Sequence, residues 1–440
     1  MLHMPASELN LKGLRVIIVS YAHRAKGRYT KLGGPALSLR DFLKHRVAEL
    51  ACIWQPLPIS DDLRVFLEVF RKGFHQVEVS FPGIRCAKYQ GKDISLLYFI
   101  LKVRDLMSSF FLLVRIRRKF QVYIGVESHN TILGILLRWL RIVEKVIYYI
   151  MDYGERRFKN RLLNGVFHAL DRFCVYHADC VWNLSPAMAE ARRKRGIRMD
   201  RAAPQIVVPI GTEFERIDRT PREGVERKCV AYLGLLSENT GARLVIESMP
   251  RILAQVPNAR LVIIGSGPLE RELKTRTKTL GLDHAVDFLG LVEDDLEVER
   301  ILVKCGVGLA PYYSDPNSIK RFTDPTKPKI YMACGLPVII TKVPPVAEEI
   351  GISQAGLVVR YDVSELTSAV VKLISSKEIH EEYRQNAIRL ASKYSWANIF
   401  SEALRETIYG SANSSHRFIA SETTQDEQSA RSRHKILKHI

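Results

Sequence analysis

The chain has 440 residues, 47% of them hydrophobic, and a formal net charge of +19 at pH 7. This length predicts two domains, and no apolar run is long enough to suggest a membrane-spanning helix. The start of the chain lacks the charged and apolar regions of a signal peptide, and the seven cysteines have no paired short spacing, so we expect a cytoplasmic chain with reduced thiols and no zinc site.

The positive charge admits several anionic partners, namely a lipid surface, a nucleotide, an acidic glycan or nucleic acid. Three basic clusters lie in the first half of the chain, at 115–119, 156–161 and 192–195. They accompany no recognition-helix or RNA-binding signature, so nucleic acid is the least favoured of these partners.

The first half alternates short apolar runs with helical patterns. A loop ending in Gly33, Gly34 and Pro35 follows the first run and leads into a helix over 35–44, and helical spacing recurs over 160–179. Such alternation predicts a parallel sheet with helices on both faces. The expected strands are 14–20, 47–53, 76–80, 121–126, 145–151, 180–184 and 205–209.

The segment 96–118 mixes bulky apolar residues with Lys102, Arg104 and a basic end. One interpretation is a helix that lies on an anionic membrane surface. The other is a core helix with a basic end, and the sequence leaves both open.

A polar segment over 213–227 separates this half from a second alternating series and is predicted to be an interdomain linker. We expect domains over 1–212 and 228–410, and a disordered tail over 411–440, which is rich in Ser, Thr, Gln and charge. Helices are expected over 242–255, 269–280, 292–304 and within 363–409. The expected strands are 229–235, 260–264, 285–289, 306–310, 336–341 and 356–360.

The stretch 322–341 is the strongest local signal in the second half. Asp324, Pro325 and Thr326 form a helix start, with Lys327 and Lys329 beside its free amides. Such a helix start attracts anions, and a phosphate is the anion we expect. The alternative is an ordinary helix start with two solvated lysines.

Two doubly wound domains carry their ligand sites outside the carboxyl ends of their strands. The loops after the strands should therefore line one cleft between the domains. These loops lie at Gly33 and Gly34, 127–130, 151–154, 235–241, 265–268 and 312–329.

The order of short motifs resembles the GT-B glycosyltransferases, specifically the mostly retaining group 1 family. The motifs are the Gly-Gly loop, Val207–Gly211, Tyr232–Gly234, Ile264–Pro268, Phe288–Gly290 and Met332–Ile339. The resemblance covers roughly 14–400 and is strongest in the second half. It implies a nucleotide-sugar donor held mainly by the second domain, an acceptor held mainly by the first, and closure between them.

Four positions depart from the family pattern. Leu235 and Thr240 stand where the family usually has an Arg and a Lys for the donor diphosphate, and Phe322 and Ile330 stand where it usually has two glutamates. Loss of these charged contacts implies either a different way of holding the donor or weak catalysis.

The predicted donor contacts include Lys327 and Lys329, as replacements for the missing cations. The carboxylate of Asp324 and the hydroxyl of Thr326 could bind a ribose or sugar hydroxyl, or simply cap the helix. For Gly33 and Gly34 the alternative is a turn that leads into a helix, and for Ser237 and Glu238 it is a polar turn. The remaining donor candidates are loop residues: Gly33, Gly34, Ser237, Glu238 and Gly265.

In the first domain, Asp152 ends a strand where the family often carries a histidine near the reacting sugar. A carboxylate there could act as a base toward an acceptor hydroxyl or stabilise a cationic sugar. Glu127 and His129 are further catalytic candidates, although a single loop histidine is more often structural. Arg156 and Arg157 bind phosphate or are simply solvated.

Together these features predict a glycosyltransferase, of hexosyl type and retaining by resemblance, that moves a sugar from a nucleotide-sugar to a glycan or lipid-linked acceptor. We expect no cofactor and no metal, no nucleic-acid partner, and a cytoplasmic protein with an anionic membrane surface as a candidate partner. The alternatives are a degenerate GT-B protein that binds nucleotide-sugar or glycan without turnover, and a nucleotide-sugar epimerase on the same fold.

Overall fold

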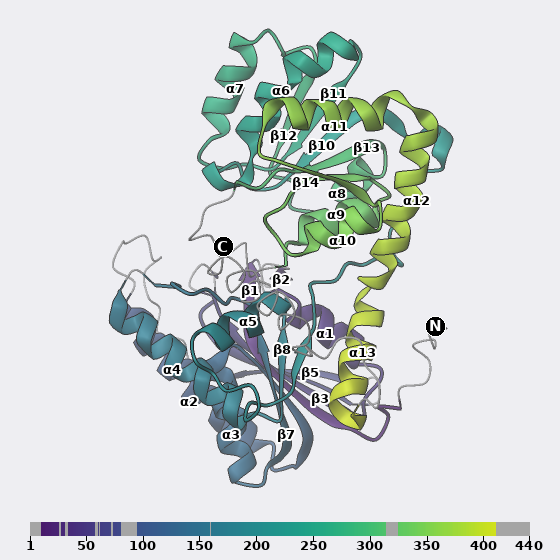
Figure 1. The fold of residues 1–440 in the computed structure, drawn as a ribbon. Helices are drawn as coiled ribbons and strands as arrows, with labels where there is room; N and C mark the ends of the chain where they lie inside the picture. Colours follow the sequence, from purple (N-terminus) through teal and green to yellow (C-terminus); the bar gives the residue numbers. More distant parts are fainter. Residues whose placement is uncertain are drawn as a thin grey trace, which may run out of the picture.

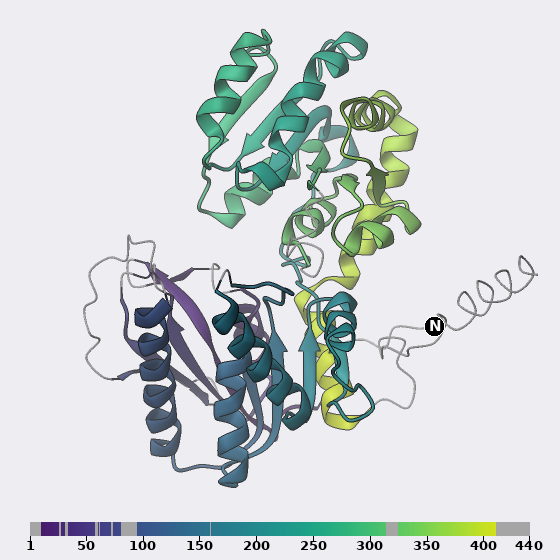
Figure 2. The same cartoon turned by 60° about the vertical axis from the view of Figure 1, so that its left-hand side comes forward.

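The computed structural model describes residues 10–25, 28–30, 34–57, 60, 62–71, 74–80, 95–158, 160–313 and 324–410. These residues form two α/β domains, one above the other in Figure 1, with the carboxyl ends of the first sheet pointing towards the second domain (Figure 2). Gly33, Phe322 and the tail 411–440 lie outside the described residues.

The first sheet has the order β5-β4-β3-β1-β6-β7-β8-β9, with β2 paired to β1. Its central strands are apolar and buried along most of their length, as both faces are covered by helices. The strands are β1 (Arg15–Ala25), β2 (Arg28–Thr30), β3 (Glu49–Pro56), β4 (Val65–Arg71), β5 (Phe74–Ser80), β6 (Phe120–Val126), β7 (Val143–Ile150), β8 (Cys180–Asn183) and β9 (Gln205–Val207).

The expectation of a parallel first sheet is wrong at one edge. The strand β4 was not predicted, and it pairs antiparallel with both β3 and β5, while β2 is antiparallel to β1. The physical reason is the length of the connections, because short turns can join only antiparallel neighbours whereas parallel neighbours need a long crossover.

Five helices of the described residues come from the first half of the chain. α2, α3 and α4 pack side by side, and α1 lies elsewhere, against the last helix of the chain (Figure 1). The Asn160 side chain caps the start of α4, where its Oδ1 accepts from the Leu162 and Leu163 amides. The helices are α1 (Ala36–Leu43), α2 (Ser95–Arg115), α3 (Ser128–Trp139), α4 (Arg161–His177) and α5 (Pro186–Lys194).

The second sheet is fully parallel, in the order β12-β11-β10-β13-β14-β15. Its strands are β10 (Glu226–Leu233), β11 (Arg260–Ile264), β12 (Val286–Gly290), β13 (Cys305–Ala310), β14 (Val338–Thr341) and β15 (Gly356–Val359). The helices are α6 (Ala242–Gln255), α7 (Glu270–Thr279), α8 (Asp295–Leu302), α9 (Thr326–Ala333), α10 (Val346–Ile352) and α11 (Val363–Ser375), with two short 3₁₀ turns, η3 (Arg222–Gly224) and η4 (Glu238–Thr240).

The end of the chain returns to the first domain through α12 (Lys377–Lys393) and α13 (Trp396–Tyr409). The Phe400 ring of α13 lies 5.7 Å from the Phe42 ring of α1, and Trp182 Nε1 donates to Thr407 Oγ1 over 2.9 Å. The sequence predicts one domain over 228–410. In the structure, α13 belongs to this range but packs on the first domain.

The two passages of the chain between the domains lie side by side. The Thr212 amide donates to Tyr394 O over 2.8 Å, and Thr212 and Ser395 form an isolated β-bridge. The residue directly before the predicted linker is thus in contact with the returning chain.

The described part of the chain contains no helix that combines the length and the apolarity needed to cross a bilayer. Six cysteines are free and buried among the described residues.

Candidate functional site

Both sheets have a point where the order of strands reverses, and the carboxyl ends there are the usual ligand sites of such folds. In the first sheet β1 lies between β3 and β6, and in the second β10 lies between β11 and β13. The loops after these strands contain most of the predicted site residues.

Backbone-to-backbone contact between two loops marks the carboxyl edge of β10 and β11. Gly234 has φ +136° and Gly265 φ +138°, which are conformations that side chains rarely adopt. A β-carbon added at Gly265 would lie 2.1 Å from the Gly234 carbonyl oxygen. The Gly234 amide also donates to Ile264 O over 2.7 Å. Neither glycine has room for a β-carbon, so the two loops can approach each other backbone to backbone.

Lys327, in the first turn of α9, lies against this glycine edge. A β-carbon added at Gly234 would fall 1.7 Å from Lys327 Nζ, and the ammonium lies 5.8 Å from the centre of the Tyr232 ring. The neighbouring Thr326 is exposed. The ammonium of Lys327 and the N-terminus of α9 therefore lie beside the backbone of Gly234 and Gly265. This arrangement is suited to phosphate.

Lys329 points elsewhere, into the interior between the domains. Its Nζ lies 2.5 Å from Asp324 Oδ2, donates to Ile210 O over 2.8 Å, and sits 3.8 Å from the centre of the Tyr394 ring. Asp324 Oδ2 also accepts from the Ile210 amide over 2.6 Å. Burial lowers the pKa of Lys329 and raises that of Asp324. Both side chains are therefore bonded to Ile210 and to each other.

Hydrogen bonds between its own residues hold the loop 235–241. The Ser237 amide donates to Thr240 Oγ1 over 3.2 Å, and Thr240 Oγ1 donates to Ser237 O over 2.7 Å. Glu238 forms an exposed ion pair with Arg243. Leu235 is 57% exposed, so the position of the family's usual arginine carries an apolar side chain in solvent.

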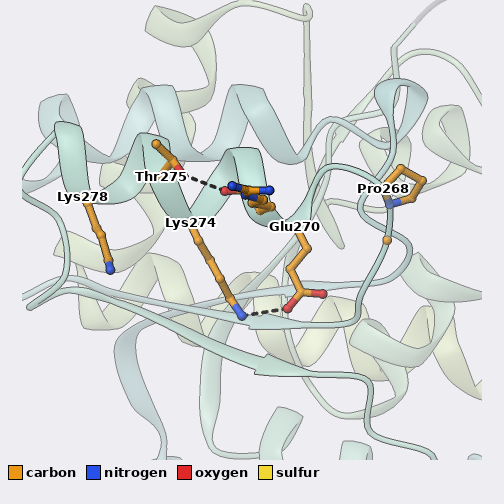
Figure 3. Close-up of a pocket in the computed structure, with 7 residues that line it drawn as sticks. Pro268, Glu270, Lys274, Thr275 and Lys278 are labelled. Carbon is orange, nitrogen blue, oxygen red and sulfur yellow. Dashed lines mark hydrogen bonds and ion pairs between the residues drawn. The ribbon is translucent and has the colours of Figure 1, made fainter.

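A hollow of about 450 Å³ flanks this region on α7, and Figure 3 shows its lining. Lys274 pairs with Glu270 over 2.7 Å, and the remaining walls come from the same helix and the loop before it. The hollow is lined by Gly267, Pro268, Glu270, Arg271, Lys274, Thr275 and Lys278.

In the first domain the structure brings Glu127 and Asp152 together. Glu127 Oε1 accepts from the backbone amides of Met151 and Asp152, each over 3.1 Å. The residue has φ +69°, a strained conformation for a side chain other than glycine, at the start of α3. Burial raises the pKa of Glu127 to about 7, against the attraction of nearby Arg157. Its carboxyl group therefore changes charge near neutral pH.

Asp152 itself is open to solvent, with 57% of its side chain exposed. Arg157 Nη2 lies 3.5 Å from Asp152 Oδ2, and the same guanidinium donates to the Asp152 carbonyl. Arg157 thus fixes the loop that carries the carboxylate. The sequence alone allows Arg157 to be either a phosphate ligand or a solvated side chain.

His129 is packed beside this pair on α3. Its Nδ1 lies 3.4 Å from Tyr21 Oη, and burial lowers the pKa of the ring to about 3, so it is neutral. Among the described residues, no hydrogen-bond partner is found for its buried Nε2. Lys102 of α2 lies 3.7 Å from the centre of the Tyr21 ring. Tyr21 is not marked as a site residue by the sequence, and Lys102 stands out there only as part of a helix with a basic end.

Of the predicted Gly-Gly loop, Gly34 belongs to the described residues and Gly33 does not. Gly34 has φ +72° just before α1, and a β-carbon added there would meet nothing within 4 Å. No group of three or more His, Cys, Asp or Glu that could hold a metal ion occurs within the described ranges.

A family model described as "Glycosyl transferases group 1" matches residues 227–376. An uncharacterized glycosyltransferase of Methanocaldococcus jannaschii is 29% identical over 181 residues, which cover 41% of this chain and 44% of that protein. The phosphatidylinositol N-acetylglucosaminyltransferase gpi3 subunit of Schizosaccharomyces pombe is 29% identical over 177 residues, 39% of this chain and 36% of that protein. The chain thus matches less than half of the length of these two relatives.

Sucrose-phosphate synthase from Thermosynechococcus elongatus has a similar structure, with a TM-score of 0.63 and 16% identity over 90% of this chain and all of that one. At this coverage the similarity extends over both domains. The GT-B fold expected from the order of the motifs is confirmed.

Proposed function

We propose that this chain, a group 1 member of the GT-B glycosyltransferases, moves a hexosyl group from a nucleotide-sugar donor to a glycan or lipid-linked acceptor with retention of configuration. The family and the fold are established by the matches above. The donor, the acceptor and the stereochemistry are part of the proposal.

The observation that carries the proposal is the position of Lys327 against Gly234. Negative charge develops on the leaving diphosphate as the glycosidic bond breaks, and a fixed cation with backbone amides stabilises that charge. The bare glycine edge lets phosphate oxygens approach the backbone closely. The family usually has an arginine at the position of Leu235 to hold the donor diphosphate. In this chain Lys327 provides that positive charge.

On the acceptor side we assign different parts to the two neighbouring carboxyl groups. Asp152 is exposed and can accept a proton from an acceptor hydroxyl or stabilise a cationic sugar. Glu127 is buried and holds the Met151 and Asp152 amides, so it positions the loop. Neutral His129 can accept or donate one hydrogen bond to a hydroxyl.

The acceptor class rests on the relatives. The Schizosaccharomyces pombe protein is named for transfer of N-acetylglucosamine to a phosphatidylinositol lipid. A lipid-linked or glycan acceptor for this chain follows by analogy, and the proposed reaction needs no bound metal because Lys327 supplies the positive charge.

A second candidate is binding without turnover. Thr240 is occupied in a turn and Leu235 is apolar, so two of the family's usual diphosphate contacts are absent. This candidate predicts donor binding but no release of nucleoside diphosphate. An epimerase, by contrast, would interconvert two nucleotide-sugars without release.

A thermal-shift screen against UDP-, GDP-, ADP- and dTDP-sugars and the free diphosphates tests the donor site. A ligand that binds only the native state raises the midpoint by mass action. We expect nucleotides of one base to raise the midpoint most. Turnover of that nucleotide-sugar is then measured with sugar acceptors, and proton NMR of the product gives its anomeric configuration. If no nucleotide shifts the midpoint at millimolar concentration, the proposal fails.

A further inference from the structure

The surface formed by α2, α3 and α4 carries about half of the large apolar side chains that are exposed in the described part of the chain. Seventeen large hydrophobic residues are identified as exposed in the described part of the chain, and nine lie on these three helices or directly after α3. We call this surface the apolar face. Its exposed residues are Val103, Met107, Phe111, Val114, Leu136, Trp139, Leu140, Leu162 and Val166.

The α2 residues of the apolar face recur at helical spacing. Val103, Met107, Phe111 and Val114 follow one another by four, four and three residues, so they form one stripe along the helix. The side of α2 opposite this stripe packs into the domain, where Leu112 and Leu113 are buried. A stripe that runs along a helix is suited to a partner that covers the helix lengthwise.

The charges around the apolar face are mostly positive, and the exposed acidic residues lie just outside the three helices, at Glu144, Glu155 and Asp179. The only acidic residues within the three helices are Asp105 and Asp171, and both are buried in ion pairs. The exposed charged residues of the helices and of the turns that follow α2 and α3 are cationic: Arg115, Arg117, Arg118, Lys119, Arg141, Arg161 and Arg172.

We propose that the apolar face docks on an anionic lipid bilayer, with α2 lying in the plane of the headgroups. A surface helix with apolar residues on its outer side and cations beside them binds membranes that contain acidic lipids. A second copy of this chain fits less well, because a two-fold contact would set the same cations against each other. The inference does not depend on the proposed reaction.

Trp139 provides a direct probe of this docking. It is 58% exposed, whereas Trp54 and Trp182 are buried and Trp396 is half-buried against Phe400. Its emission should move to shorter wavelength when vesicles of phosphatidylcholine and phosphatidylserine are added, and stay unchanged with phosphatidylcholine alone. Trp139→Phe keeps the apolar side chain, so it should bind vesicles equally but lose the shift.

Two triple variants separate the apolar and the electrostatic parts in a vesicle co-sedimentation assay. Met107→Ser with Phe111→Ser and Trp139→Ser should abolish binding. Arg117→Gln with Lys119→Gln and Arg141→Gln should weaken it roughly a hundredfold at low salt, since each cation contributes about fivefold. The first control removes as many exposed apolar residues from the second domain, Leu289→Ser, Leu291→Ser and Ile352→Ser. The second removes three exposed cations there, Arg271→Gln, Lys278→Gln and Lys342→Gln.

Both controls should bind like the parent protein. The proposal would be overturned if a triple variant and its control lost vesicle binding equally. It would also be overturned if the parent protein did not bind the anionic vesicles at all. Size-exclusion chromatography without lipid completes the test. A dimer that Met107→Ser, Phe111→Ser and Trp139→Ser converts to a monomer would assign the apolar face to a second copy instead.

Discussion

Lys329 Nζ lies 2.5 Å from Asp324 Oδ2 in the interior between the two domains, and the pair forms hydrogen bonds with both the amide and the carbonyl of Ile210, just before the linker. The Tyr394 ring, from the second passage of the chain, covers the ammonium. The pair therefore connects the start of α9 to both passages between the domains.

Removing one member of this pair should strongly destabilise the protein. Lys329→Met leaves the Asp324 carboxylate buried without its partner, which costs about 3–5 kcal/mol. Urea unfolding should show this loss, whereas Lys327→Met, at a half-buried position, should change stability by much less. Adding Asp324→Asn to Lys329→Met should recover part of the loss. Equal stability of Lys329→Met and the parent would disprove the structural role.

The glycine edge predicts a large difference between two glycine substitutions. Gly265→Ala forces a β-carbon to within 2.1 Å of Gly234 O at φ +138°, and we expect a loss of about 3 kcal/mol or more, together with loss of donor binding. Gly34→Ala has φ +72° and open space, so it should cost only about 1–2 kcal/mol. Similar losses from both changes would show that the contact between the loops is unimportant.

Glu127 should make stability depend on pH in a defined window. Burial raises its pKa from 4.5 to about 7, so the folded state holds a proton that the unfolded state has lost. The protonated Glu127 therefore adds to the free energy of unfolding. This added stability is present in full below pH 4.5, and about 3 kcal/mol of it is lost as the pH rises to 7. Glu127→Gln keeps an oxygen for the Met151 and Asp152 amides but cannot titrate.

The measurement for Glu127 is the difference in unfolding free energy between the parent and Glu127→Gln, by urea titration at several pH values. We expect the parent to lose stability relative to the variant across this window. A difference that stays constant between pH 4.5 and 7 would show that the carboxyl group titrates normally.

Chelation should leave the reaction intact. Lys327 and the N-terminus of α9 supply positive charge at the proposed diphosphate site, so turnover in EDTA should equal turnover without it. Activity that disappears on chelation and returns with Mg²⁺ or Mn²⁺ would contradict a metal-independent site.

Most of the second domain could be predicted from sequence, because its six strands are short apolar runs between helical patterns. Residues 338–341 are buried along their whole length, as such a run suggests. The strand β4 was missed, because Val65–Arg71 follows β3 after a short connection and carries Glu68 and Arg71 within it. The packing of α13 on the first domain depends on contacts such as that of Phe400 with Phe42, which no local pattern reveals.

The two lysines show why the candidate site was harder to predict. Lys327 and Lys329 look alike in sequence, but two positions on a helix differ by roughly 200° around its axis, so they point to opposite sides. Helix geometry could have separated them. Which of the two meets the glycine edge could not be predicted, since that depends on how α9 packs against β10 and the linker. The assignment of the catalytic and donor residues remains a prediction.

The most direct test of the account is acceptor-dependent release of nucleoside diphosphate by the parent protein, Lys327→Ala and Lys274→Ala. A charge-assisted contact contributes about 1.5–3 kcal/mol, so Lys327→Ala should lower kcat/KM roughly ten- to a hundredfold. Lys274→Ala removes an exposed lysine of α7 and should match the parent. Release that is equally fast in all three proteins would contradict the proposed diphosphate site.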